Sequence, residues 1–197
     1  MTNATQEETK LGAYVAPSDL MNLLTNVATH ADTRRDAIPA LNSIRLWADS
    51  GYLFAAATDR YRLIEGRITL EEGRELAPIL VSVADSKRLC AMMKENPIGR
   101  VELHVIGDLL SVSVSGGAAA TVRGVYGTFP PYSHVFDNGT PTPTDKLTLN
   151  PRFIADYAKI AGKDKPISLV SLGEGKPIAI EGLPEGYAAR VMPMKIR

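Results

Sequence analysis

The chain has 197 residues, of which 45% are hydrophobic and 22% are charged, the composition of an ordinary globular protein with a sizeable core. Its 22 basic and 22 acidic residues cancel, so the composition gives no support to tight, charge-driven binding of nucleic acid. A single cysteine, Cys90, excludes a disulfide framework and cysteine-based metal sites and fits a reducing cytoplasm. Cys90 stands in an apolar helical pattern, which favours an inert core thiol over a reactive one.

The first part of the chain predicts a strand, a helix and three more strands. Residues 1–10 are polar without an apolar period, so we expect a flexible arm there. Pro17-Ser18-Asp19 is a helix-start signal, and the apolar residues after it recur at helical spacing: Leu20, Leu23, Leu24, Val27 and Ala31. The expected strands cover residues 11–15, 43–48, 52–58 and 62–69, with Asp49-Ser50-Gly51 as a hairpin turn.

The same order of elements then returns twice. In the second unit, Ser82 or Asp85 can cap a helix that reaches residue 95, and the expected strands cover residues 79–81, 101–106, 109–114 and 118–126. A Pro/Thr/Gly-rich linker over 137–145 precedes the third unit. There Asn150-Pro151 begins a helix that stops at Gly162, and the expected strands cover residues 146–149, 167–172, 177–180 and 187–192. The chain thus predicts three strand–helix–strands units of about 60 residues, at 11–77, 78–137 and 138–197.

Two short segments carry most of the functional signal. Ala56-Ala57-Thr58-Asp59-Arg60-Tyr61-Arg62-Leu63 leads from an apolar strand into a polar, arginine-bearing turn, and Val191-Met192-Pro193-Met194-Lys195-Ile196-Arg197 ends the sequence on an apolar step. Together they resemble the bacterial replicative sliding clamp, the beta subunit of DNA polymerase III. Phe129-Pro130-Pro131-Tyr132 is similar to the F-P-x-Y segment of that family, and Leu149-Asn150-Pro151 precedes a helix as it does there.

The resemblance implies an α+β DNA-clamp fold, with antiparallel sheets outside and pore-lining helices inside. Residues 11–137 look like the complete middle domain of a clamp, and 138–197 like the second half of its last domain. The family's first domain and the other half of the last domain have no counterpart. At about half the length of a cellular clamp, the chain is expected to be a phage-encoded version that acts in the host cytoplasm.

Clamps bind peptides of polymerases and clamp loaders in a hydrophobic pocket, and the resemblance places that pocket at Thr58, Arg60, Tyr61, Arg62, Leu63, Val191, Met192, Pro193, Met194 and Lys195. Methionines adapt to different ligand side chains, which suits a surface with many partners. From the pattern alone, Met192 and Met194 could equally finish a core strand. An exposed apolar chain end is otherwise a liability, which favours the binding role.

Basic residues lie opposite the apolar faces of the second and third predicted helices. Alone, this pattern is typical of solvated helix faces. The resemblance implies instead that they face double-stranded DNA without reading its sequence: Arg34, Arg35, Lys87, Lys94, Arg152, Lys159 and Lys163.

Catalysis finds little support, because His30, His104 and His134 are scattered and no nucleophile or phosphate-binding motif is present. We therefore expect a non-enzymatic processivity factor without cofactors, metals or membrane contact, which tethers a DNA polymerase. A clamp-like decoy that sequesters clamp-binding proteins is the alternative, and a small hydrolase or transferase is a weaker third. Clamp rings contain twelve half-domain units, so three units per chain predict a homo-tetramer, in which the third unit pairs with its counterpart from another chain.

Overall fold

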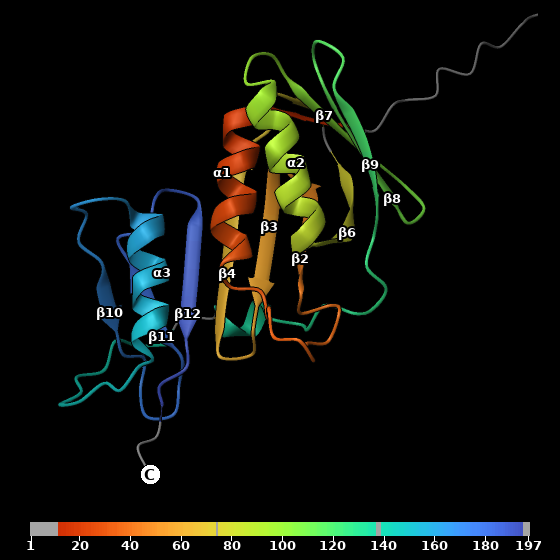
Figure 1. Cartoon of the computed structure of the whole chain (residues 1–197). Coiled ribbons are helices and arrows are strands. Elements are labelled where there is room, and N and C mark those ends of the chain that lie inside the picture. Colours follow the sequence, from red (N-terminus) through yellow and green to blue (C-terminus); the bar gives the residue numbers. More distant parts are fainter. Residues whose placement is uncertain (1–11, 74, 137–138, 195–197) are drawn as a thin grey trace, which may run out of the picture.

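The computed structural model describes residues 12–73, 75–136 and 139–194. The expected flexible arm at 1–10 and the pocket residue Lys195 lie outside this part of the chain. The described residues form two antiparallel sheets and three α-helices (Figure 1). The helices are α1 (Pro17–Ala28), α2 (Val83–Glu95) and α3 (Pro151–Ala161), and a short 3-10 helix, η1, covers Ser133–Val135.

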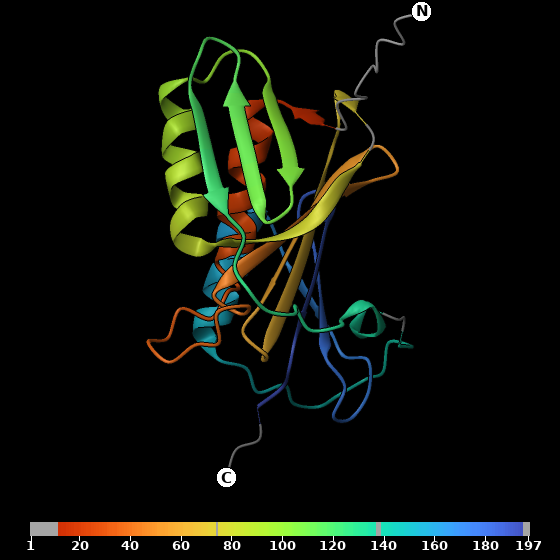
Figure 2. The same ribbon diagram turned by 90° about the vertical axis from the view of Figure 1, so that its right-hand side faces the viewer.

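The larger sheet has seven strands in the order β10-β11-β12-β4-β3-β2-β6, and the smaller one has five in the order β5-β1-β7-β8-β9. All three helices lie on one side of the larger sheet (Figures 1 and 2). The strands are β1 (Ala13–Val15), β2 (Ser43–Asp49), β3 (Tyr52–Thr58), β4 (Arg62–Thr69), β5 (Glu72–Gly73), β6 (Leu76–Ser82), β7 (Val101–Ile106), β8 (Leu109–Val114), β9 (Ala119–Arg123), β10 (Ser168–Val170), β11 (Ile178–Glu181) and β12 (Tyr187–Val191).

The first two units are interlocked because each gives its first strand to the sheet of the other. β1 pairs with β7 of the second unit, and β6 pairs with β2 of the first. Helices α1 and α2 pack side by side above the sheets, and their apolar residues are buried in one continuous core: Leu20, Leu23, Leu24, Leu89 and Met93. Burial raises the pKa of the Cys90 thiol on α2, which fits the inert thiol expected from the sequence.

The helix starts follow the capping signals of the sequence. The Ser82 hydroxyl accepts the backbone N–H of Asp85 at 3.0 Å and donates to the Asp85 carboxylate at 2.7 Å, so both predicted capping residues take part. Asn150 caps α3 by accepting the N–H of Arg152 at 3.0 Å, with Pro151 in the first turn.

The third unit departs from the prediction at its beginning. Residues 146–149 form no strand and belong to no sheet within the described part of the chain, so the strand predicted there is wrong. In the first two units, the corresponding strand pairs with the sheet of a neighbouring unit. Within the described residues, no strand of another unit receives this segment, and its Thr148 carbonyl accepts the N–H of Met194 from the same unit at 2.8 Å.

Most strand bounds agree with the prediction within one or two residues, and the exceptions have local causes. β9 ends at Arg123 rather than at residue 126, because the N–H of Gly124 bonds to Asp108 at 2.7 Å and that of Val125 bonds to Leu80 on β6 at 2.8 Å. β6 extends over Leu76–Ser82 because β2 pairs with most of its length. The two-residue strand β5 was not predicted, since Glu72-Gly73 reads as a turn.

Candidate functional site

The turn between β3 and β4 is held by two of its own side chains. The Thr58 hydroxyl donates to the carbonyl of Arg62 at 2.7 Å and accepts the N–H of Arg60 at 3.1 Å. The Asp59 carboxylate accepts the N–H groups of Tyr61 and Arg62, both at 3.0 Å. These bonds hold Arg60 at a φ of 77°, a conformation that non-glycine residues rarely adopt. The Thr-Asp pair thus determines the shape of the turn, and Tyr61 at its tip is 56% exposed.

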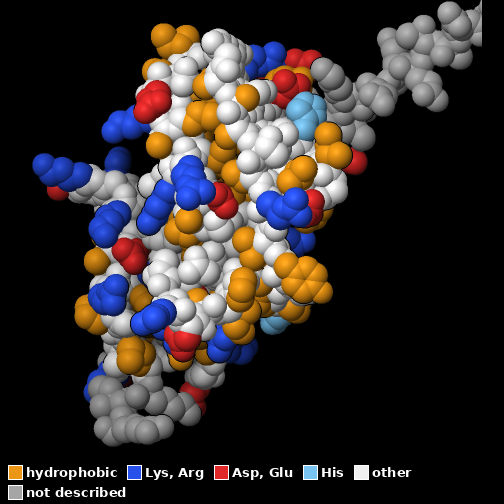
Figure 3. Space-filling view, turned by 45° about the vertical axis from the view of Figure 1, so that its right-hand side comes forward, with side chains coloured by type: hydrophobic (Ala, Val, Ile, Leu, Met, Phe, Trp, Pro, Cys, Tyr) orange, Lys and Arg blue, Asp and Glu red, His pale blue; other side chains and the backbone are white. Residues whose placement is uncertain are grey.

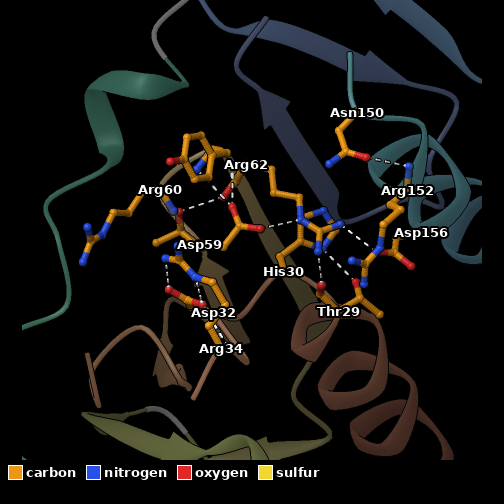
Figure 4. Close-up of polar contacts among 12 residues, drawn as sticks. Thr29, His30, Asp32, Arg34, Asp59, Arg60, Arg62, Asn150, Arg152 and Asp156 are labelled. Atoms are coloured by element: carbon orange, nitrogen blue, oxygen red, sulfur yellow. Dashed lines mark hydrogen bonds and ion pairs between the residues drawn. The ribbon is translucent and has the colours of Figure 1, made fainter. Parts of the chain in front are cut away.

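Arg62 joins three parts of the molecule (Figure 4). Its guanidinium forms ion pairs with Asp59 at 2.9 Å and with Asp156 of α3 at 2.7 Å, and donates to the carbonyl of Thr29, just past α1, at 2.7 Å. It also stacks over the Phe153 ring at 4.4 Å. The side chain is only 9% exposed. Its charge therefore serves the contact between the first and third units.

His30 is buried beside this cluster. Its Nδ1 lies 2.8 Å from the Thr29 hydroxyl, its Nε2 has no hydrogen-bond partner, and its ring lies 5.0 Å from the ring of Tyr157 on α3. Burial, and then the Arg62 charge, lower the pKa of His30 from 6.5 to about 3. Burial raises the pKa of Tyr157, whose hydroxyl donates to the Arg190 carbonyl at 3.2 Å. His30 is thus a neutral part of the core where α1 meets α3.

A cavity of about 260 Å³ opens beside the turn, where the first and third units meet. Seven of the predicted pocket residues line it together: Thr58, Arg60, Tyr61, Arg62, Leu63, Val191 and Met192. Six further residues complete the wall: Pro130, Pro131, Tyr132, Val135, Pro177 and Arg190. Its size is just below the roughly 300–1,000 Å³ of typical small-molecule sites and suits a few apolar side chains of a peptide.

Pro193 and Met194, the last two described residues, follow Met192 but do not line the cavity. The N–H of Met192 bonds to the Tyr61 carbonyl at 2.7 Å, and that of Met194 bonds to the Thr148 carbonyl at 2.8 Å. These bonds hold the end of the chain against both the turn and the third unit. Pro193 and Met194 were expected in the pocket, but the structure places them at its margin, and Met194 is 52% exposed.

The segment around Phe129-Pro130-Pro131-Tyr132 forms the opposite wall. The rings of Phe129 and Tyr132 are buried and meet edge to face with centroids 5.7 Å apart. The Tyr132 hydroxyl donates to the Glu65 carboxylate of β4, and burial raises the pKa of that tyrosine. The sequence resemblance had identified this segment but had not placed it at the pocket. Pro130 and Pro131 belong to no apolar pattern of a helix or strand, so only the fold shows that they lie at the cavity.

The predicted DNA-facing residues are all exposed, and five of them lie on or just past α2 and α3. The exposed charges of the three helices are mainly basic: Lys87, Arg88, Lys94, Arg152 and Lys159, against Asp19 and Glu95. Lysine and arginine side chains are spread over the left half of Figure 3, which carries the helices, with single acidic residues between them. Arg34 is paired with Asp32 at 2.6 Å and Lys159 with Asp156 at 3.3 Å, so the surface is only mildly positive.

In the described part of the chain, no helix is both long enough and apolar enough to span a bilayer. Histidine, cysteine and carboxylate side chains form no group there that could hold a metal ion.

Comparison with known proteins identifies the fold. No protein-family model and no curated protein matches the chain. Among solved structures, a DNA polymerase sliding clamp from Bacillus subtilis matches with a TM-score of 0.78 and 12% identity, over 96% of this chain and 66% of that one. A DNA polymerase III beta subunit from Thermotoga maritima gives 0.70 and 16% over 100% and 69%, and a sliding clamp from Pseudomonas aeruginosa bound to griselimycin gives 0.71 and 15% over 100% and 68%. The chain spans about two thirds of the length of these proteins, and it has the fold of the DNA polymerase sliding clamps.

Proposed function

We propose that this protein is a processivity clamp, which encircles duplex DNA and tethers replication proteins by their peptides. The observation that carries the proposal is the cavity, where the turn at 58–62 and the C-terminal strand of a clamp fold meet. Its apolar wall and few polar groups suit a short peptide with apolar side chains. Tethering a polymerase raises its concentration at the template, and the clamp itself performs no chemistry.

In this proposal, residues 11–137 are a complete clamp domain and residues 138–197 are half of another. The interlocked sheets of the first two units support the first assignment. The segment at 146–149, which joins no described sheet, supports the second, because a half-domain lacks the sheet that would receive its first strand. The third unit is completed by the same unit of a second chain, and four chains supply the twelve units of a ring.

The peptide site gives the first test. A labelled peptide with a glutamine followed by a leucine and paired apolar residues should bind the cavity. Met192→Glu places a charge in the apolar wall, and deletion of residues 194–197 removes the bond to Thr148. Each change should weaken binding at least tenfold, or about 1.4 kcal/mol, in fluorescence anisotropy.

Ile98→Glu is the matched control for Met192→Glu. Ile98 is 85% exposed and does not line the cavity, so its variant should bind the peptide like the parent. Unchanged affinity in both cavity variants, with the parent's circular dichroism spectrum, would place the peptide elsewhere.

The helix surface gives the second test. A combined variant replaces five basic residues by neutral ones: Lys87, Lys94, Arg152, Lys159 and Lys163. This variant should be retained for a shorter time on circular duplex DNA, and its retention should depend less on salt, because fewer counterions are released. The fold should be retained, since these side chains are exposed and lie off the apolar faces of the helices. Retention is measured by gel filtration of preassembled complexes over a range of salt concentrations.

The control variant replaces Arg67 on β4 and Lys176 in the β10–β11 turn by neutral residues. It should leave retention on DNA unchanged. Equal salt slopes for the helix variant and the parent would show that the helices do not face DNA. A decoy that only captures peptides would pass the peptide test but show no retention on DNA in the parent.

A further inference from the structure

The wall of the cavity contains a positive charge among apolar residues. Arg190 lies on β12, directly opposite Leu63 of β4 on one side and Ala179 of β11 on the other. Val135 and Pro177 line the cavity together with it. Residues directly opposite each other on antiparallel strands point to the same face of a sheet, so Arg190 has an apolar side chain beside it on each neighbouring strand.

Most N–H groups of the Arg190 guanidinium lack an acceptor. Within the described part of the chain, Nη1 donates to the Ala189 carbonyl at 3.0 Å, and Nε is buried without a hydrogen-bond partner. The guanidinium also lies over the Phe136 ring, 5.3 Å from its centroid. A buried donor without an acceptor is unfavourable, and more so when it carries a charge. The cavity wall therefore holds donors that a bound ligand can satisfy.

The acidic residues on the same face of the sheet do not neutralise Arg190. The strand registers place Glu65 of β4 and Glu181 of β11 on that face. Glu65 accepts the hydroxyl of Tyr132, and among the described residues neither carboxylate forms an ion pair with Arg190. Burial lowers the pKa of Arg190, and the negative charge of Glu181 opposes this only in part.

The other two arginines of the wall have different surroundings. Arg62 is neutralised by Asp59 and Asp156. Arg60 is exposed, and its side chain points away from Arg62 (Figure 4). None of the described aspartates and glutamates lines the cavity. The cavity is therefore largely apolar but positively charged, and its charge complements that of a carboxylate.

An extended peptide has two kinds of carboxylate. The side chain of an acidic residue next to an apolar one points to the opposite side, and that of a residue two positions away lies roughly 7 Å along the chain. The α-carboxylate of the last residue, in contrast, is attached to the same Cα as its side chain. Since Arg190 lies directly beside Leu63, a terminal apolar residue fits both groups at once.

We propose that the cavity binds the C-terminal end of a partner polypeptide, with the apolar last side chain against Leu63 and Met192 and the α-carboxylate on the guanidinium of Arg190. A carboxylate can accept two parallel hydrogen bonds from one arginine, which satisfies the buried Nε. Capture of a free C-terminal carboxylate is a recurring mode of peptide recognition. The inference rests on the proposed peptide site and deepens it, because it states which end of the partner binds.

Three peptides test the proposal. Each is labelled at its N-terminus and contains a glutamine followed by a leucine and, at its end, two adjacent apolar residues. The first has a free C-terminal carboxylate, the second is its C-terminal amide, and the third is that amide with an aspartate two positions before the last residue. In fluorescence anisotropy, the parent protein should bind the first peptide about tenfold more tightly than the second, and the aspartate should not restore the difference.

Arg190→Met removes the guanidinium and keeps an unbranched apolar side chain. The free-carboxylate peptide and its amide should bind this variant within about twofold of each other. Arg67→Met is the matched control, because Arg67 lies on the same face of the sheet and over the Tyr52 ring at 4.6 Å but does not line the cavity. It should keep the parent's preference. Arg60→Met should also keep most of it, because an exposed pair contributes little.

Equal affinities of the parent for the free-carboxylate peptide and its amide would overturn this inference and leave the proposed clamp function standing, since both peptides bind. Loss of the preference in Arg60→Met but not in Arg190→Met would also overturn it. Recovery of full affinity by the aspartate peptide would assign the guanidinium to an acidic side chain instead. These peptide comparisons on the parent need no variant, so they decide the question even if Arg190→Met folds poorly. A parent that binds none of the three peptides would contradict the peptide site itself.

Discussion

Replacing Arg62 by alanine should lower the free energy of unfolding by about 3 kcal/mol, because Asp59 and Asp156 then lose their shared partner in a largely buried site. The Thr29 carbonyl loses a charged donor, and the Phe153 ring loses the cation above it. Arg62→Lys should cost less, because an ammonium keeps the charge but cannot reach all of these acceptors. Urea denaturation at neutral pH measures the free energy of unfolding of both variants.

Arg88→Ala is the control for this experiment. Arg88 also pairs with an aspartate three residues away, at 3.1 Å, but its side chain is 80% exposed. Such a pair contributes about 0.5 kcal/mol or less. An Arg62→Ala variant as stable as Arg88→Ala would show that the cluster between α1, β4 and α3 does not hold the third unit in place.

The second large effect is a loss of stability in acid that arises from His30. The pKa of this residue is about 3 in the folded protein and 6.5 in the unfolded chain, so between these values only the unfolded chain binds the proton. The contribution of neutral His30 to the free energy of unfolding is therefore fully present above pH 6.5, and it decreases as the pH falls towards 3. Within that window the slope approaches 1.4 kcal/mol per pH unit.

His30→Phe removes the titrating group and should flatten this dependence between pH 6 and pH 4.5, where the parent loses about 2 kcal/mol. His134→Gln changes an exposed histidine and should leave the parent's slope unchanged. The pKa of Asp156 is also shifted, downwards: burial opposes ionisation, but hydrogen bonds from Arg62 and Lys159 outweigh it. The Asp156 carboxylate therefore loses its contribution to the free energy of unfolding at a lower pH than the range in which His30 acts. The effects of the two residues can thus be distinguished along a pH titration. Parallel curves for parent and His30→Phe would exclude His30 as the source.

The local elements could be predicted because their signals are local. The strands at 52–58 and 62–69 have the predicted bounds, and both helix caps act through the residues that the sequence indicated. The turn from Thr58 to Arg62 is also a local structure, since its hydrogen bonds connect residues at most four positions apart.

The contacts between units could not be predicted in the same way. Arg62 reads as a polar residue at a strand start, and its burial depends on Asp156, 94 positions away. Pro130, Pro131 and Pro177 reach the cavity only because the linker after β9 and the β10–β11 turn converge there. The segment at 146–149 has the alternating pattern of a strand, but a strand also needs a neighbour, and none of the described strands pairs with it.

The exchange of β1 and β6 has a consequence for the order of folding. Neither of the first two units can complete its sheet before the other is present, so they should form in one cooperative step whose rate is independent of protein concentration. The segment at 146–149 differs, because its pairing strand comes from a second molecule in the proposed assembly. Its amide protons should therefore exchange faster as the protein is diluted, while those of β1 and β6 keep the same protection.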